Sequence, residues 1–310
     1  MRLKGSFYIF LYKMRIYYGV WRTTTLDVTD ICMKQLCHDN IITIPAGDNK
    51  RTRYFTDPLF GVHKQIIIEN NGILSEYDSL AEIQIDLTTG IVMDVNAMIN
   101  NQLKNIHSKL KINYGVLNDE VPEQKMAIRY LTGNEKVLEI GGNIGRNSLV
   151  ISSILNDAKN LVTLECDPQI ACQLKENRDL NGLGFQIENA ALSNRKLIQR
   201  GWDTMPSEVL LDGYNWVNTI TLDQLKNKYT IEFDTLVLDC EGAFYYILID
   251  MPEILNNINT IVMENDYRDI THKNYIDSIL SINHFYRDYV EGGGWGPCEN
   301  NFFEVWKRQQ

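Results

Sequence analysis

The sequence lacks the patterns that mark several large classes of protein. Its six cysteines include no C-x-x-C pair, so neither a redox motif nor a paired-cysteine zinc site is predicted. Lys13 and Arg15 interrupt the apolar residues of the N-terminus long before these could span a membrane, and no small-residue cleavage site follows. We therefore expect a reduced, cytoplasmic chain with no membrane partner.

Excess positive charge is also absent. The formal net charge is -10 at pH 7, whereas nucleic-acid binders usually present a basic face that releases counterions from phosphate. Nucleic acid is thus disfavoured as a partner. The 310 residues are 44% hydrophobic, which supports well-packed cores in one large or two modest domains.

The first part of the chain, 1–115, is predicted to be a small β-rich accessory module. Short β-like runs alternate with turn residues at 16–21, 41–45, 64–69 and 82–87. One helix is expected near 30–36, and a linker or connecting helix at 101–113. The apolar segment 7–12 (FYIFLY) is interpreted as strand-forming, and both Met1 and Met14 remain candidate starts.

Several polar residues in this module could form a binding surface, but their turn-rich surroundings favour solvated turns. They are Asp48, Arg51, Arg53, Asp57 and His63. The part is also faintly similar to small modules attached to viral carbohydrate enzymes.

From residue 116 to 310 the pattern changes to alternating strands and helices. Short apolar strands between helices predict an α/β fold with a mostly parallel sheet covered on both faces, as in Rossmann-like proteins. Two aromatic runs near the end, HFYRDYV and NFFEVWK, flank GGGWGPC and predict an antiparallel hairpin added to that sheet.

A glycine-rich loop follows the first of these strands, in LEIGGNIGRNS at 138–148. A dinucleotide site requires G-x-G-x-x-G, whose glycines allow a tight turn and a close approach to pyrophosphate. Asn143 and Arg146 stand where the second and third glycines should be, so a dinucleotide is disfavoured.

Acidic and amide side chains stand at the predicted carboxyl ends of successive strands, where open parallel sheets bind ligands. They are Glu139, Glu165, Asn189, Asp239, Glu241, Glu264 and Asp266. Fixed negative charge repels pyrophosphate but suits S-adenosylmethionine, which carries a sulfonium and an ammonium and no phosphate. Glu165 is placed to accept the ribose diol, and Asn189 and Ala190 to border the adenine.

These residues give the chain from about Val121 onward a resemblance to the FkbM family of S-adenosylmethionine-dependent methyltransferases. The similarity lies in VLEIGGNIGRNS, LVTLECDP, TITLDQL and FDTLVLDCEGAFYYIL. It implies a class I methyltransferase fold with a seven-stranded sheet. The family motifs carry over to Glu139, Gly141, Asn143, Gly145, Glu165, Asp239, Glu241 and Gly242. The sequence departs from the family pattern at Glu139, Asp167, Val237 and Phe244.

The expected reaction is methyl transfer to a hydroxyl of a sugar, glycan or other small polar acceptor. Glu241 is the candidate base or its orienter, and Asp239 is expected to line the methyl end of the cofactor site. A divalent metal held by Asp239 and Glu264 or Asp266 is the open alternative. His63, His272 and His284 are assigned to surface or core and Trp202 to packing, while Trp295 is left open between packing and substrate.

Two other functions remain open. One is methylation of a nucleic acid, which would require a basic face. The other is a non-catalytic carbohydrate-binding or scaffold protein, in which the first module carries the function.

Overall fold

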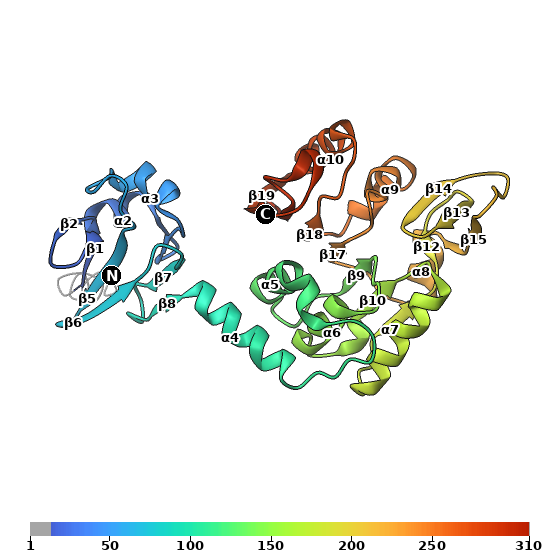
Figure 1. The fold of residues 1–310 in the computed structure, drawn as a ribbon, viewed down its shortest axis with the longest axis horizontal. Coiled ribbons are helices and arrows are strands. Elements are labelled where there is room, and N and C mark those ends of the chain that lie inside the picture. Colours follow the sequence, from blue (N-terminus) through green and yellow to red (C-terminus); the bar gives the residue numbers. More distant parts are fainter. Residues whose placement is uncertain (1–13, 310) are drawn as a thin grey trace, which may run out of the picture. The chain divides into compact units, whose positions relative to one another are not determined.

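The computed structural model describes residues 14–309 and divides the chain into two compact units, Met1–Gln102 and Leu103–Gln310 (Figure 1). The sequence pattern places the boundary at 115/116. Helix α4 (Val95–His107) runs across the boundary between the units, and a loop follows it. The segment FYIFLY, expected to form a strand, lies outside the described residues.

The N-terminal unit contains two four-stranded antiparallel sheets and two short helices. One sheet has the order β2-β1-β5-β6 and the other β3-β4-β7-β8. In both β4 and β7 every second residue is an isoleucine buried in a common core, so one face of each strand is buried. The bounds are β1 Met14–Val20, β2 Thr24–Asp27, α2 Thr29–Gln35, β3 Cys37–His38, β4 Ile41–Ile44, α3 Asp48–Phe55, β5 Gln65–Asn70, β6 Ile73–Tyr77, β7 Ile83–Asp86 and β8 Val92–Asp94.

Helix α3 corrects the prediction of solvated turns. It begins after Gly47 and contains Arg51, whose side chain is fully buried. The Arg51 guanidinium donates hydrogen bonds to the backbone carbonyls of Pro45, Asp78 and Ala81. Because those carbonyls supply the partners that water would otherwise give, the charge is tolerated inside the unit. A solvated position for Arg51 was therefore wrong, while Arg53 is exposed as expected.

The C-terminal unit is built on a seven-stranded sheet in the order β11-β10-β9-β17-β18-β20-β19. The first five strands are parallel and the last two are antiparallel, which confirms the predicted fold class. Apart from the edge strand β11, the parallel strands are mostly apolar because both of their faces are covered. The bounds are β9 Val137–Ile140, β10 Leu161–Leu164, β11 Gln186–Glu188, β17 Thr235–Leu238, β18 Thr260–Glu264, β19 Phe285–Glu291 and β20 Phe303–Arg308.

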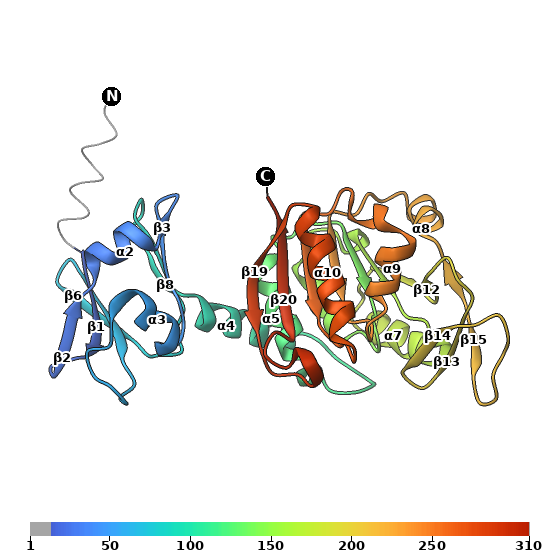
Figure 2. The same cartoon turned by 90° about the horizontal axis from the view of Figure 1, so that it is seen from above.

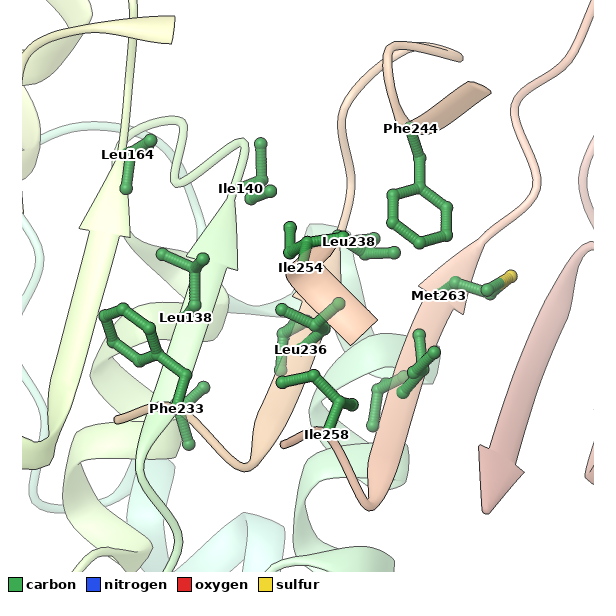
Figure 3. Close-up of a cluster of buried hydrophobic side chains, with 14 of the residues drawn as sticks. Leu138, Ile140, Leu164, Phe233, Leu236, Leu238, Phe244, Ile254, Ile258 and Met263 are labelled. Atoms are coloured by element: carbon green, nitrogen blue, oxygen red, sulfur yellow. The ribbon is translucent and has the colours of Figure 1, made fainter. Parts of the chain in front are cut away.

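Helices cover both faces of this sheet. Figures 1 and 2 show α5 and α6 on one side of it and α9 and α10 on the other. Side chains from the strands and helices meet in one core, part of which is drawn in Figure 3. The helices are α5 Val121–Tyr130, α6 Arg146–Ile154, α7 Pro168–Leu180, α8 Leu222–Tyr229, α9 Phe244–Asp250 and α10 Ile270–Ile282, with 3-10 turns η1 Leu117–Glu120, η2 Ala158–Asn160, η3 Pro252–Leu255 and η4 Gly296–Cys298.

A small antiparallel sheet interrupts the alternation and was not predicted. β12 (Ala191–Leu192) pairs with β16 (Thr219–Ile220), and between them β13 (Leu197–Arg200), β14 (Asp203–Pro206) and β15 (Asn215–Val217) form the order β14-β13-β15. Most residues of β14 and β15 are exposed, so these strands lack the alternation that marks a half-buried strand.

Candidate functional site

The glycine loop after β9 is required by packing between strands and helix. Gly141 has φ 94°, and a Cβ there would lie 1.6 Å from the backbone oxygen of Asp239. Gly145 has φ 93°, and its Cβ would lie 2.4 Å from a methyl carbon of Leu174. The Asp239 backbone therefore excludes a side chain at Gly141, and the positive φ would strain one at Gly145. The loop brings the backbone of Gly141 and Asn143 to the wall of a cavity.

That cavity has a volume of about 910 Å³ and lies at the carboxyl ends of β9, β10, β17 and β18. Its lining includes most of the site residues predicted from sequence, namely Gly141, Asn143, Glu165, Ala190, Asp239 and Glu241. The fold thus brings together side chains from four strand ends.

Glu165, directly after β10, is buried at the wall of the cavity. One carboxylate oxygen accepts the Asn143 backbone N–H at 2.9 Å, and the other accepts the Asp167 N–H at 2.8 Å. Burial raises the pKa of this carboxyl, and the two backbone donors oppose the rise. Each oxygen retains acceptor capacity for a further donor, so Glu165 can receive a ligand hydroxyl.

Three predicted residues lie behind the cavity. Within residues 14–309, the lining of the cavity does not include Glu139, Gly145 or Asn189. The buried Glu139 accepts a hydrogen bond from the Ser148 hydroxyl, and burial raises its pKa to about 7. The Asn189 side chain donates to the Glu165 backbone oxygen at 2.8 Å. Through these contacts each of the two side chains orders an element of the cavity wall.

Two hydrogen-bonded pairs of carboxyl groups face the cavity near the ends of β17 and β18. The inner pair is Glu123 on α5 with Glu264 at the end of β18. Burial, followed by the charges and hydrogen bond of its acidic neighbours, raises the pKa of Glu264 to about 10. Glu123 is also buried, and its pKa is raised by that burial. The inner pair therefore holds a proton near neutral pH.

The outer pair is Glu241 with Asp266. Glu241 has φ 50° on the turn after β17 and is exposed at the cavity mouth. Desolvation and the neighbouring Asp266 raise the pKa of Glu241 to about 8, and Arg268 opposes this rise. Asp239 interacts with members of both pairs, and its pKa is raised well above its ordinary value by burial and then by the charges of Glu120, Glu123 and Glu241.

Sequence reasoning missed several residues of the lining. Glu120 and Glu123 lie around the start of α5, where acidic residues are common and carry no distinctive signal. His272, assigned to surface or core, lines the cavity and stacks on Tyr245 with ring centroids 3.8 Å apart. Trp202, assigned to packing, is 65% exposed and also lines the cavity, so that assignment was wrong.

The remaining candidates lie elsewhere. His63 and His284 are exposed, and the half-exposed Trp295 is not part of the cavity wall as described for residues 14–309. In the same part of the chain, no three His, Cys, Asp or Glu side chains are grouped so that they could hold a metal ion. None of the helices described there has the length and apolarity needed to cross a membrane.

Comparison with known proteins gives similarity of fold only. No family model and no curated protein matches the sequence. Among solved structures, an O-methyltransferase from Bacillus cereus in complex with S-adenosylhomocysteine is 13% identical, with a TM-score of 0.40 over 69% of this chain and 91% of that one. A ribosomal protein L11 methylase from Lactobacillus delbrueckii subsp. bulgaricus is 11% identical, with a TM-score of 0.40 over 64% and 82%.

A third similar structure is an rRNA methylase from Streptococcus thermophilus, at 8% identity and a TM-score of 0.38 over 60% of this chain and 94% of that one. The strand order and the two antiparallel strands give the C-terminal unit a Rossmann-like, class I methyltransferase fold. Similarities at these TM-scores do not indicate a substrate. The function must therefore be inferred from the residues that line this protein's own cavity.

Proposed function

We propose that the C-terminal unit is an S-adenosylmethionine-dependent methyltransferase that acts on a hydroxyl of a sugar, glycan or other small polar acceptor. The observation that carries the proposal is the acidic cavity at the carboxyl ends of the parallel strands. A ligand that carries positive charge and offers hydrogen-bond donors suits the carboxyl groups of this lining.

The charge of the cavity separates the candidate cofactors. Like charges about 4 Å apart repel each other by about 4 kcal/mol at the effective dielectric of a protein surface, so a pyrophosphate beside Asp239 would further oppose ionisation of that carboxyl and is disfavoured. S-adenosylmethionine has no phosphate. Glu165 would accept its ribose diol, Ala190 would border its adenine, and Asp239 would face its positive groups.

Glu241 is the residue that we assign as general base. When bound, the cofactor supplies an activated methyl group, and the protein must then hold the acceptor oxygen in line with it. Glu241 lies at the mouth of the cavity, where an acceptor would enter. Once ionised, its carboxylate can take the proton of the acceptor hydroxyl as the new bond forms. While Glu241 is protonated it donates a hydrogen bond to Asp266, and this hydrogen bond is lost when Glu241 ionises.

The acceptor class also follows from chemistry. The sequence after β17, DCEGAF, lacks the Asn or Asp followed by Pro-Pro and an aromatic residue that is typical of exocyclic-amine methyltransferases. Exposed polar and aromatic groups at the cavity, including Trp202, Asp203 and Tyr246, suit a polar ring with several hydroxyls.

The test is to incubate the purified chain with methyl-labelled cofactor and a panel of sugars, nucleotide sugars, oligosaccharides and RNA. We expect label on a sugar-class acceptor, with activity that survives a metal chelator. Label only on RNA would support nucleic-acid methylation, and activity lost on chelation would support the metal-assisted route. Calorimetry that detects NAD binding but no S-adenosylhomocysteine binding would contradict the proposal as a whole.

A further inference from the structure

The hairpin of β13 and β14 places a tryptophan at its turn. Arg200 pairs with Asp203, which leaves a turn of two residues. The first is Gly201, with φ 58°, and the second is Trp202. A turn of this kind requires glycine at its first position, whereas asparagine, aspartate or serine usually follows it. Trp202 is 65% exposed and lines the cavity. Neither turn geometry nor core packing therefore explains its large aromatic ring.

Contacts within the small sheet hold this hairpin in place. The Tyr214 hydroxyl donates a hydrogen bond to the Asp203 carboxylate at 3.4 Å. The Arg200 guanidinium lies over the Tyr214 ring, 4.7 Å from its centroid. Asp203 is exposed in the lining of the cavity and retains acceptor capacity for a further donor. The hairpin thus presents an aromatic face beside a hydrogen-bond acceptor, and a ligand can use both with little reorganisation of the protein.

This hairpin and the proposed base lie at different strand ends. Thr204 of the hairpin forms a side-chain hydrogen bond with Cys166, which lines the cavity just beyond β10. Glu241 lines the cavity beyond β17. Strand β9 lies between β10 and β17, so these two ends are separated by two strand spacings, or about 10 Å, before side chains reach inward.

A second exposed aromatic ring lines the cavity on the β17 side. It belongs to Tyr246 on α9, the helix that follows the turn with Glu241. The His272 ring meets it edge-on with centroids 5.6 Å apart, and the Arg195 guanidinium lies 5.7 Å from its centroid. Each of the two aromatic rings is therefore flanked by polar side chains. A sugar ring has the matching chemistry, because its C–H groups form an apolar face and its hydroxyls project from the edge.

We propose that the acceptor is an oligosaccharide of at least two sugar rings, one of which stacks on Trp202. The other ring offers the reacting hydroxyl near Glu241 and Tyr246. This inference rests on the proposed function and narrows the acceptor class given there. One sugar ring is shorter than the separation between the two strand ends, whereas two linked rings can span it. Asp203 then accepts a hydroxyl at the edge of the ring on Trp202.

The test measures transfer of label from methyl-labelled cofactor to acceptors of increasing length, with the full chain. The acceptors are methyl glycosides of one, two and three rings, built from glucose, galactose, mannose or N-acetylglucosamine. We expect the kcat/KM of the wild type to rise roughly 3- to 10-fold from one ring to two, as for other stacking contacts of aromatic rings. The reacting ring is the same in both, so the gain should appear mainly in KM.

Trp202→Ala should remove this gain, so that acceptors of one and two rings have similar kcat/KM. Trp202→Phe retains an aromatic face and should keep part of the gain. Trp216→Ala is the matched control, because Trp216 is a 48% exposed tryptophan of the same small sheet that lies outside the cavity wall described within residues 14–309. It should leave the dependence on acceptor length unchanged. All three substitutions are at exposed positions, so the melting temperatures should agree closely.

Calorimetry with S-adenosylhomocysteine separates the acceptor from the cofactor. Trp202→Ala should bind this probe within about twofold of the wild type. A loss of about tenfold would assign the Trp202 ring to the cofactor and overturn the inference.

The remaining outcomes are distinguishable. Equal kcat/KM for one and two rings in the wild type, or equal losses on both in Trp202→Ala, would overturn the second-ring site and leave methyl transfer to a sugar intact. A wild-type protein that binds S-adenosylhomocysteine but labels none of these glycosides would reject the sugar acceptor, and the inference with it. Absence of S-adenosylhomocysteine binding would reject the proposed methyltransferase itself.

Discussion

Two sites, one in each unit, bury charged side chains in contrasting environments. In the N-terminal unit, Arg51 donates to three or more backbone carbonyls, and the ammonium of Lys64 lies 2.9 Å from Asp57 and 3.6 Å from Asp48. In the C-terminal unit, carboxyl groups crowd around a cavity, and one oxygen of Glu123 has no partner within residues 14–309.

This difference separates a structural role from a binding role. A buried charge with a full set of partners fixes the fold around it, and removing it leaves those partners unpaired. A buried charge that lacks partners raises the free energy of the empty protein and lowers it again when a complementary ligand binds. We therefore expect substitutions at the two places to have opposite consequences for stability and binding.

The largest expected effect is the loss of the N-terminal core on replacing Arg51 with methionine. Arg51→Met leaves buried carbonyls unpaired and should reduce the stability of that unit by about 3 to 5 kcal/mol. Amide hydrogen exchange of β4 and β7 measures the loss directly. Arg53→Met, on the same helix but exposed, is the matched control and should have almost no effect. If both variants behave alike, the Arg51 contacts are not what holds this unit together.

Next in size is the effect of Glu241→Gln on turnover. The substitution keeps the shape but removes the base, so kcat should fall about 100-fold or more with little change in cofactor affinity. Wild-type turnover should rise with pH through about 8, as Glu241 loses its proton. His272→Asn tests the other base that lines the cavity. A larger loss there, with Glu241→Gln still active, would transfer the role to His272.

A smaller effect is expected on cofactor affinity from Glu165→Ala. Removing the carboxylate should weaken S-adenosylhomocysteine at least about tenfold, because a hydrogen bond to a charged acceptor contributes about 1.5 to 3 kcal/mol. Glu188→Gln is the control, since Glu188 ends the neighbouring strand β11 but bonds to Lys228 and Tyr229 instead of lining the cavity. Comparable losses from both would show that the effect concerns strand ends in general.

The dependence of stability on pH should also differ in sign between Glu264 at the cavity and Asp57 in the N-terminal unit. The pKa of Glu264 is raised from 4.5 to about 10. The protonated carboxyl therefore contributes to the stability of the folded protein at low pH, and this contribution is lost as the pH rises from the first of these values to the second. Glu264→Gln should therefore stabilise the free protein increasingly between about pH 5 and 8.

In the N-terminal unit the corresponding group is Asp57, whose pKa is lowered from 3.8 mainly by its hydrogen bond with Lys64. It contributes stability above its ordinary pKa, and this is lost as the pH falls through the lowered value. Asp57→Asn should thus destabilise at neutral pH and lose its effect in acid. Denaturant titrations over a pH series measure both, and equal slopes for the two variants would contradict the contrast.

The smallest expected effect concerns where the chain can be divided. A chain that begins at Leu103 should fold and bind cofactor like the full protein, because it retains the whole second unit. Beginning at Asn118 removes the hydrogen bonds from the Lys111 backbone to Asn181 and from the Asn113 backbone to Asn177 on α7. We expect this shorter chain to melt a few degrees lower, as measured by thermal unfolding. A chain from Leu103 that fails to fold would show that the units are interdependent.

Much of the C-terminal unit follows from local patterns. Strands such as β17 are continuous apolar runs because they are covered on both faces, and an acidic residue directly after such a run must lie at the carboxyl edge of the sheet. That reasoning brought Glu165, Asp239 and Glu241 to the cavity. It could not tell that Glu139 and Asn189 bond behind the wall, because this depends on Ser148 and on the backbone of Glu165.

The N-terminal unit was less predictable. The strands predicted at 16–21, 41–45, 64–69 and 82–87 were recognised from short β-like runs separated by turn residues, but α3 was taken for turns since its residues are mostly polar. Arg51 is buried there only because three carbonyls from distant parts of the unit converge on it.

The sequence by itself determined the α/β architecture, the acidic strand ends and the unsuitability of the glycine loop for pyrophosphate. Each of these features follows from residues that are close together in the sequence. Only the tertiary structure decided which carboxyl groups meet. Glu123 and Glu264 are far apart in the chain, and the packing of α5 near the end of β18 makes them a pair. A local sequence pattern cannot predict such a contact. The proton that the pair shares and the oxygen without a partner both result from burial in the folded protein.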